Sequence, residues 1–174
     1  EVIRLSQIVS KQGTLKKGQR WLYRQFSAFV CLLFGVSESE LNKQLSDEDV
    51  YAAQVEVGRT LVVNVLKNLP IAILWRVDWK AASKQALFTK ALFARGLGHL
   101  CQCLIAESAR TGKLDWDKLN RLSELPISDI SDDFWFASGV TEEHLNSRRI
   151  VRGCDKRIAR VLCYELDIKP TLNI

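Results

Sequence analysis

The residues of this sequence whose types and spacing could do chemistry are concentrated in one basic segment near the C-terminus. Between Arg148 and Arg160 there are six basic side chains and one acidic side chain, a balance equal to the formal charge of +5 of the whole chain. The six are Arg148, Arg149, Arg152, Lys156, Arg157 and Arg160. Clustered Lys and Arg side chains displace the counterions condensed on nucleic-acid phosphates. The segment therefore predicts contact with a polyanion, and double-stranded DNA is the partner we expect.

This basic segment has two parts with different geometry. Its first three arginines approach a predicted final helix, and its other three cations share the outer side of that helix, because Lys156 and Arg160 lie four residues apart. Most of the six should contact phosphates, which give affinity and register. Arg149 and Arg152 are the candidates for contact with base edges.

An acidic stretch directly before the basic segment offers a different interpretation. Residues 129–143 contain several Asp and Glu side chains, which could already neutralise the arginines within the chain. For the same electrostatic reason, the basic segment could dock on an acidic surface of another protein. The alternative function is therefore a non-catalytic protein–protein interaction or homo-oligomerisation module.

A second group of basic residues lies near the N-terminus. It consists of Lys16, Lys17, Arg20 and Arg24. The last three fall at intervals of three and four residues, which predicts a basic stripe along one helix face. Trp21 and Tyr23 between them could stack on exposed bases, although the helical spacing favours Trp21 as a core residue.

Neither a metal site nor a catalytic site is favoured by the remaining reactive side chains. On a helix, Cys101 points away from the face that His99 and Cys103 share, and there is no CxxC pair to complete a zinc site. Cys154 lies near His144 in sequence and ahead of a predicted helix N-terminus, which would lower the pKa of its thiol. Proximity in sequence is weak evidence for a nucleophile, so we expect no enzyme activity, no metal and no cofactor.

Composition indicates a single helical domain over residues 1–174. The chain is 47% apolar and 26% charged, and its five cysteines form an odd set in apolar surroundings, which is typical of reduced thiols in a cytoplasmic protein. The longest uncharged apolar run, 69–75, is far shorter than the roughly 20 residues needed to span a bilayer, so we expect no membrane partner. The chain contains no methionine, which suggests either the C-terminal portion of a longer protein or modified methionines.

The periodicity of apolar residues predicts an all-α, compact multi-helix fold with about seven to eight helices. The predicted helices cover residues 3–13, 14–34, 37–45, 46–69, 81–110, 115–122 and 155–169, with a capped turn at 141–146. Thr14, Ser37, Thr141 and Asp155 are the predicted caps of four of these segments, and Glu40 completes a capping box with Ser37. Gly35 and Gly112 are predicted helix stops.

Two further patterns concern packing. Gly96 and Gly98 interrupt the long helix predicted over 81–110, and two glycines so close predict a kink or a close backbone contact. The clearest amphipathic stripe is in the helix predicted over 46–69. Its members are Val50, Ala53, Val57, Leu61, Val65 and Leu69.

In the order of these landmarks the chain resembles the C-terminal helical region of the DGQHR-domain proteins, which include the DndB-like DNA sulfur-modification proteins. The resembling segments are 68–70 with Trp75, 91–100, 115–123 and 148–153 with the final helix to Ile168. The resemblance implies a DNA-binding transcription regulator associated with a DNA modification or phage-defence system. The Asp-Gly-Gln-His-Arg signature that names the family is absent, so no chemistry of that signature is carried over.

Overall fold

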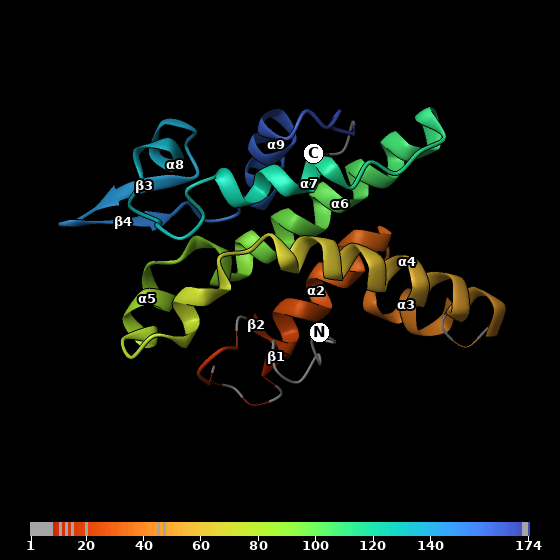
Figure 1. Cartoon of the computed structure of the whole chain (residues 1–174), viewed down its shortest axis with the longest axis horizontal. Helices are drawn as coiled ribbons and strands as arrows, with labels where there is room; N and C mark the ends of the chain where they lie inside the picture. The colour runs from red at the N-terminus through yellow and green to blue at the C-terminus, as the bar shows by residue number, and fades with distance from the viewer. Residues whose placement is uncertain are drawn as a thin grey trace.

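The computed structural model describes residues 9–10, 12, 14, 16–19, 21–44, 46, 48–171 and 174, and this part of the chain is mostly helical (Figure 1). Its α-helices are α2 (Tyr23–Phe34), α3 (Glu38–Gln44), α4 (Glu48–Lys67), α5 (Trp79–Gln85), α6 (Ala91–Thr111), α7 (Asp117–Asn120), α8 (Asp133–Ala137) and α9 (Asp155–Glu165). Its 3₁₀-helices are η1 (Ile71–Trp75), η2 (Leu87–Thr89) and η3 (Arg121–Glu124), and its strands are β1 (Val9–Ser10), β2 (Trp21–Leu22), β3 (Thr141–His144) and β4 (Ser147–Ile150). The strands form two two-stranded sheets, which the all-α prediction lacks. Within the described residues, no helix is long and apolar enough to cross a membrane.

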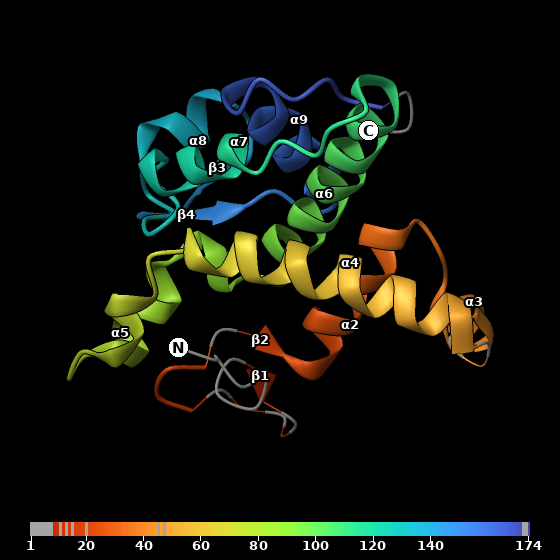
Figure 2. The ribbon, with the colours of Figure 1, turned by 45° about the vertical axis from the view of Figure 1, so that its right-hand side comes forward.

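The helix α6 is the element around which the others pack. Its buried residues follow one another with little interruption between Phe93 and Leu104. The helices α2 and α9 make the most extensive contacts with it. Figures 1 and 2 place α9 on the upper side of α6 and α2 on the lower side. A helix covered on two opposite sides is apolar over most of its circumference.

Two glycines allow these two neighbours to approach α6 closely. A Cβ atom built on Gly96 would lie 2.6 Å from Cγ2 of Ile158 in α9. A Cβ on Gly98 would lie 2.7 Å from Cβ of Leu32 and 2.8 Å from the backbone oxygen of Phe29, both in α2. The prediction that these glycines mark a close contact is therefore confirmed.

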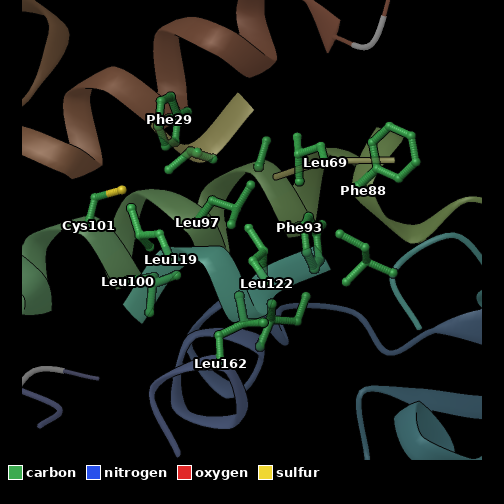
Figure 3. Packing of buried hydrophobic residues seen from close by; sticks show 14 of the residues in the cluster. Phe29, Leu69, Phe88, Phe93, Leu97, Leu100, Cys101, Leu119, Leu122 and Leu162 are labelled. Carbon is green, nitrogen blue, oxygen red and sulfur yellow. The ribbon is translucent and has the colours of Figure 1, made fainter. Parts of the chain in front are cut away.

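The buried side chains form one cluster on both sides of α6 (Figure 3). Leu97 and Leu100 of α6, Leu119 of α7 and Leu162 of α9 all belong to this cluster. On the other side, the fully buried indole of Trp21 donates from Nε1 to the backbone oxygen of Phe88 at 2.9 Å. The interpretation of Trp21 as a core residue is confirmed, and stacking of its ring on a base is excluded by its burial.

Three of the predicted helix ends, at Gly35, Ser37 and Gly112, are confirmed. Gly35 and Gly112 have φ values of 69° and 71°, in the left-handed region that glycine adopts without steric cost. The hydroxyl of Ser37 accepts a hydrogen bond from the backbone N–H of Glu40 at 3.1 Å at the start of α3. These ends depend only on residues three or four positions apart.

The predicted start of the second helix at Thr14 is wrong. The helix α2 begins at Tyr23, and the residues before it form β2, which pairs in parallel with β1. The side chain of Gln25 accepts a hydrogen bond from the backbone N–H of Leu22 at 2.8 Å, which satisfies one donor at the actual helix start. The first predicted helix falls mostly on residues outside the described part of the chain.

The apolar stripe predicted for α4 is only half correct. Leu61 and Val65 are fully buried, as is nearly all of Leu69, but Val50 and Val57 are 37% and 43% exposed. In Figures 1 and 2 the N-terminal half of α4 extends beside α3, away from α9. That half therefore lies beyond the main core.

The long helix predicted over 81–110 is broken into α5, η2 and α6. No glycine or proline lies at the break, so the sequence holds no local stop signal there. The break is held by tertiary contacts, because the backbone N–H of Phe88 donates to the oxygen of Ile127 at 3.1 Å. The Thr89 hydroxyl also donates to the backbone oxygen of Ser83 at 2.7 Å.

The turn predicted to be capped by Thr141 is a β-hairpin. Strands β3 and β4 pair antiparallel, with Glu142 opposite Arg149 and Glu143 opposite Arg148. Both strands are polar and lack apolar alternation, and the two-residue loop places Leu145 at φ 54° with no glycine to signal it. Opposite charges directly across the strands stabilise the pairing by roughly 0.2–1 kcal/mol each.

Substitution of either glycine of α6 should destabilise the fold. Alanine favours a helix by up to about 1 kcal/mol more than glycine, but its methyl group would overlap packed atoms at these positions. We therefore expect Gly96→Ala and Gly98→Ala each to lower the free energy of unfolding by about 1–3 kcal/mol. Gly58→Ala in α4 is the control, because its Cβ would meet only a ring edge of Phe34 at 3.2 Å. Denaturant titration measures all three, and equal effects at the three positions would contradict the close-contact explanation.

Candidate nucleic-acid interface

The six cations of the C-terminal basic segment lie on the hairpin, on the turn after it and on α9. Arg148 and Arg149 belong to β4, and Arg152 lies in the turn that follows. The other three are in α9, where Ile158, Ala159 and Leu162 face the core. The basic side of α9 is therefore outward, as predicted.

Arg148 is held by contacts within the chain. Its Nη2 atom lies 2.6 Å from Oδ1 of Asp133, and its Nη1 donates to the backbone oxygen of Ser131 at 2.6 Å. Its guanidinium also lies 4.7 Å from the centre of the Phe136 ring. Because its charge and its donors are engaged on three sides, Arg148 stabilises the packing of the hairpin on α8.

Two more of the six cations have partners in the acidic stretch. Arg149 donates from Nε to Oε1 of Glu142 at 2.8 Å, across the hairpin. Arg157 donates from Nη1 to the backbone oxygen of Gly139 at 2.6 Å. Local neutralisation by residues 129–143 therefore accounts for Arg148 and Arg149, while Arg157 binds a backbone carbonyl in that stretch.

The remaining cations of the segment lie on an open surface. Arg152 and Arg160 are exposed, and within the described part of the chain neither has an acidic or hydrogen-bonding partner. Lys156 is also exposed and shares a face of α9 with Arg160 and Tyr164, at intervals of four residues. We call Arg152, Lys156 and Arg160 the α9 basic face.

The structure places two further cations beside Arg160 that sequence reasoning missed. Arg110 in the last turn of α6 and Lys169 after α9 line the same pocket as Arg160. Arg110 and Arg160 lie 50 positions apart in the chain, so no local pattern connects them. Only the crossing of α6 and α9 brings them together.

The N-terminal basic group does not form the predicted helical stripe. Lys16 and Lys17 are exposed but precede α2, and Arg24 is exposed in its first turn. Arg20 lies outside the described residues. Because α2 and α9 lie on opposite sides of α6 (Figures 1 and 2), Arg24 and the α9 basic face do not belong to one continuous surface.

Asp155, the predicted N-cap residue of the last helix, does not occupy the cap position. The N-cap position of α9 is Cys154, and Asp155 is the first helical residue, with its carboxylate buried. Oδ2 of Asp155 lies 2.8 Å from Nε of Arg95 and 3.7 Å from Nε2 of His99, both in α6. The three side chains tie the start of α9 to α6, and an acid there also complements the helix dipole.

Burial disfavours the thiolate form of Cys101 and Cys154, whereas a hydrogen bond from Cys163 lowers the pKa of the Cys103 thiol to about 6. Burial raises the pKa of the Cys154 thiol to about 11, although this residue lies at a helix N-terminus, and the thiol donates to the backbone oxygen of Val140. Burial also raises the pKa of Cys101 to about 12. Among the described residues there is no group of three or more His, Cys, Asp or Glu side chains that could hold a metal ion. The prediction that the helix start lowers the pKa of Cys154 is therefore wrong, because desolvation outweighs the helix dipole.

Comparison with known proteins identifies no relative of this chain. No protein-family model matches it, and neither a curated protein nor a solved structure matches it.

The burial of His99 should make the stability of the fold depend on pH. Burial lowers the pKa of His99 below its ordinary value of 6.5, against the opposing attraction of Asp155, and the cations Lys156 and Arg95 lower it further. In the unfolded chain the imidazole takes up a proton near pH 6.5, whereas the folded chain does so only at lower pH. As the pH falls below 6.5 the unfolded state therefore binds more protons, and the free energy of unfolding should fall by at most about 1.4 kcal/mol per pH unit.

Denaturant titrations at pH 7.5 and pH 5.5 measure this dependence. His99→Gln is the comparison, since it keeps a polar side chain but cannot titrate, and the loss of stability between the two pH values should shrink in this variant. An identical loss in both proteins would show that other groups carry the pH dependence.

Proposed function

We propose that this chain binds double-stranded DNA through the α9 basic face, without catalysis. The observation that carries the proposal is that Arg152 and Arg160 are exposed and lack an acidic partner in the described chain, while their neighbours Arg148 and Arg149 are paired. Exposed cations without an internal counter-charge are the ones that can exchange condensed counterions for phosphate contacts.

The orientation of α9 supports this proposal. Ile158, Leu162 and Gly96 hold one side of the helix against α6, so the opposite side stays exposed along the helix. Lys156 and Arg160 are separated by four residues, about 6 Å along the helix axis. An exposed helix with cations on successive turns can lie against a duplex backbone, where such contacts give affinity and register rather than sequence preference.

Base reading is best assigned to Arg152. Arg149 was the other candidate, but its guanidinium is 2.8 Å from Glu142 and would have to leave this ion pair to reach a base. Arg152 lies in the turn before α9, next to Gly153, which has a φ of 70° and open space around it. Such a turn allows the backbone to approach a groove closely.

The wider role follows from the resemblance to DGQHR-domain proteins. On that basis we assign the protein to the regulators of DNA modification or phage-defence systems, in the cytoplasm. The order of the resembling segments supports this assignment, and it is independent of whether the α9 basic face binds DNA.

An exposed apolar surface on α4 favours a second candidate function, self-association. Tyr51, Val55, Val57 and Val63 are 43–52% exposed on this helix. Helices that carry apolar residues on several sides are usually buried in a larger assembly. A second copy of the chain is the occupant that this hypothesis requires.

The DNA-binding proposal predicts different effects for two charge-matched double variants. Arg152→Ala/Arg160→Ala should weaken binding to a duplex by tenfold or more and reduce the slope of log affinity against log salt by about 2. Arg148→Ala/Arg149→Ala removes the same charge from paired positions and should change the affinity much less. A fluorescence anisotropy titration over a salt series measures both, and absence of duplex binding at low salt would refute the proposal.

The self-association hypothesis is tested separately by light scattering. If α4 forms the contact, the wild type should be larger than a monomer, and Val55→Glu/Val57→Glu should dissociate it. Val77→Glu is the control, because Val77 is 99% exposed outside α4. A monomeric wild type at high protein concentration would exclude this function.

A further inference from the structure

A pocket of about 750 Å³ opens at the C-terminal half of α9. The last turns of α6, the side chain of Lys118 from α7 and the segment that follows α9 form its other walls. Its size falls within the range of pockets that hold small organic ligands. Its lining combines charged side chains from several elements with apolar ones, so we consider what could bind there.

The charges around this pocket do not cancel. Lys118 donates to the carboxylate of Glu107 and to the backbone oxygen of Asp167, and Glu107 also accepts a hydrogen bond from the backbone N–H of Lys169 at 2.9 Å. Although burial raises the pKa of Glu107, these hydrogen bonds lower it below its ordinary value, so the pair is an internal ion pair. Three cations then face the pocket against the one remaining acid, Asp167. They are Arg110, Arg160 and Lys169.

Helix dipoles explain only part of this gathering of cations. Arg110 lies in the last turn of α6, where a cation complements the partial negative charge of the helix end. Arg160 lies in the middle of α9, and Lys169 lies beyond its end, so neither has that role. Three like charges from three segments repel one another across a shared hollow, and a bound anion relieves that repulsion.

The rest of the lining suits a flat organic group. Cys163 and Ile168 are buried at 0% and 2% exposure, and they give the pocket an apolar floor. Tyr164 lines the same pocket and is 84% exposed, so its ring is open on its outer side. A tyrosine ring in this state offers a stacking surface for a nucleobase, next to cations that bind phosphate.

We propose that this pocket binds a nucleoside phosphate, with the phosphate held by Arg110, Arg160 and Lys169 and the base stacked on Tyr164. The ligand could be a free nucleotide or a nucleotide at the end of a single strand, since both present the same chemistry. The inference goes beyond duplex binding and does not require it, because the pocket shares Arg160 with the α9 basic face but is not lined by Arg152 or Lys156.

Isothermal titration calorimetry of the full chain with adenosine 5′-monophosphate tests the proposal. We expect saturable binding that weakens tenfold or more in Arg110→Ala/Lys169→Ala and severalfold in Tyr164→Ala. Arg59→Ala/Lys67→Ala is the matched control, since it removes the same charge from exposed positions of α4 and should leave binding unchanged. Circular dichroism at the same temperature shows that each variant is folded.

Three competitors define the ligand further. Adenosine without phosphate should bind much more weakly, and inorganic phosphate should also bind more weakly than the nucleotide. Equal binding of phosphate and nucleotide would overturn the assignment of a base, and no saturable binding of the nucleotide at millimolar concentration would overturn the site. A short single-stranded oligonucleotide with a 5′-phosphate that displaces the nucleotide supports the site with a strand end as its source, whereas failure to displace it supports a free nucleotide.

These outcomes are distinct from those of duplex binding. Arg110→Ala/Lys169→Ala tests the pocket without touching the α9 basic face, and Arg152→Ala tests that face without touching the pocket. If the chain binds the nucleotide but no duplex, the proposed function fails and this inference stands. If it binds duplex but Arg110→Ala/Lys169→Ala does not affect nucleotide binding, this inference fails and the proposed function stands.

Discussion

The close approach of two helices to α6 is the constraint on which the rest of the structure depends. Gly96 meets Ile158 of α9, and Gly98 meets the backbone of Phe29 in α2, at distances that leave no room for a Cβ atom. Residues two positions apart on an α-helix point to nearly opposite sides, since each residue turns the helix by about 100°. One tripeptide therefore sets the distance of both neighbouring helices from α6 and places them on opposite sides of it.

The position of α9 decides which of its charges are available. With Ile158 held against α6 and the Asp155 carboxylate bound to Arg95, the helix cannot rotate to bury its cations. Asp133 of α8 and Glu142 of the hairpin neutralise the two arginines of β4, and Arg157 binds a backbone carbonyl instead. What remains exposed is a narrower surface than the charge of the sequence implies. That surface leads along α9 from the turn at Arg152 to the pocket beside Arg160.

Much of the helical fold could be predicted, because helix ends depend on short-range chemistry. Gly35, Gly112 and the Ser37 cap were recognisable from single residues and their near neighbours. The break between α5 and α6 could not be recognised in this way, since it depends on a hydrogen bond from Phe88 to Ile127, 39 positions away. The hairpin was missed for a related reason. Its strands place opposite charges across from each other and its turn has Leu145 at a positive φ, so neither apolar alternation nor a glycine indicates the hairpin in the sequence.

By itself, the sequence determined that the chain is mostly helical, where several helices end, and that its excess positive charge lies in one short segment. These properties depend on the residues and their nearest neighbours along the chain, so they could be predicted from the sequence. Only the tertiary structure decided which cations are already paired, that His99 is buried, and that Arg110 joins Arg160 and Lys169 around one pocket. The physical reason is that burial and charge pairing depend on groups many positions apart, such as Arg95 and Asp155, which only packing brings within a few ångströms of each other.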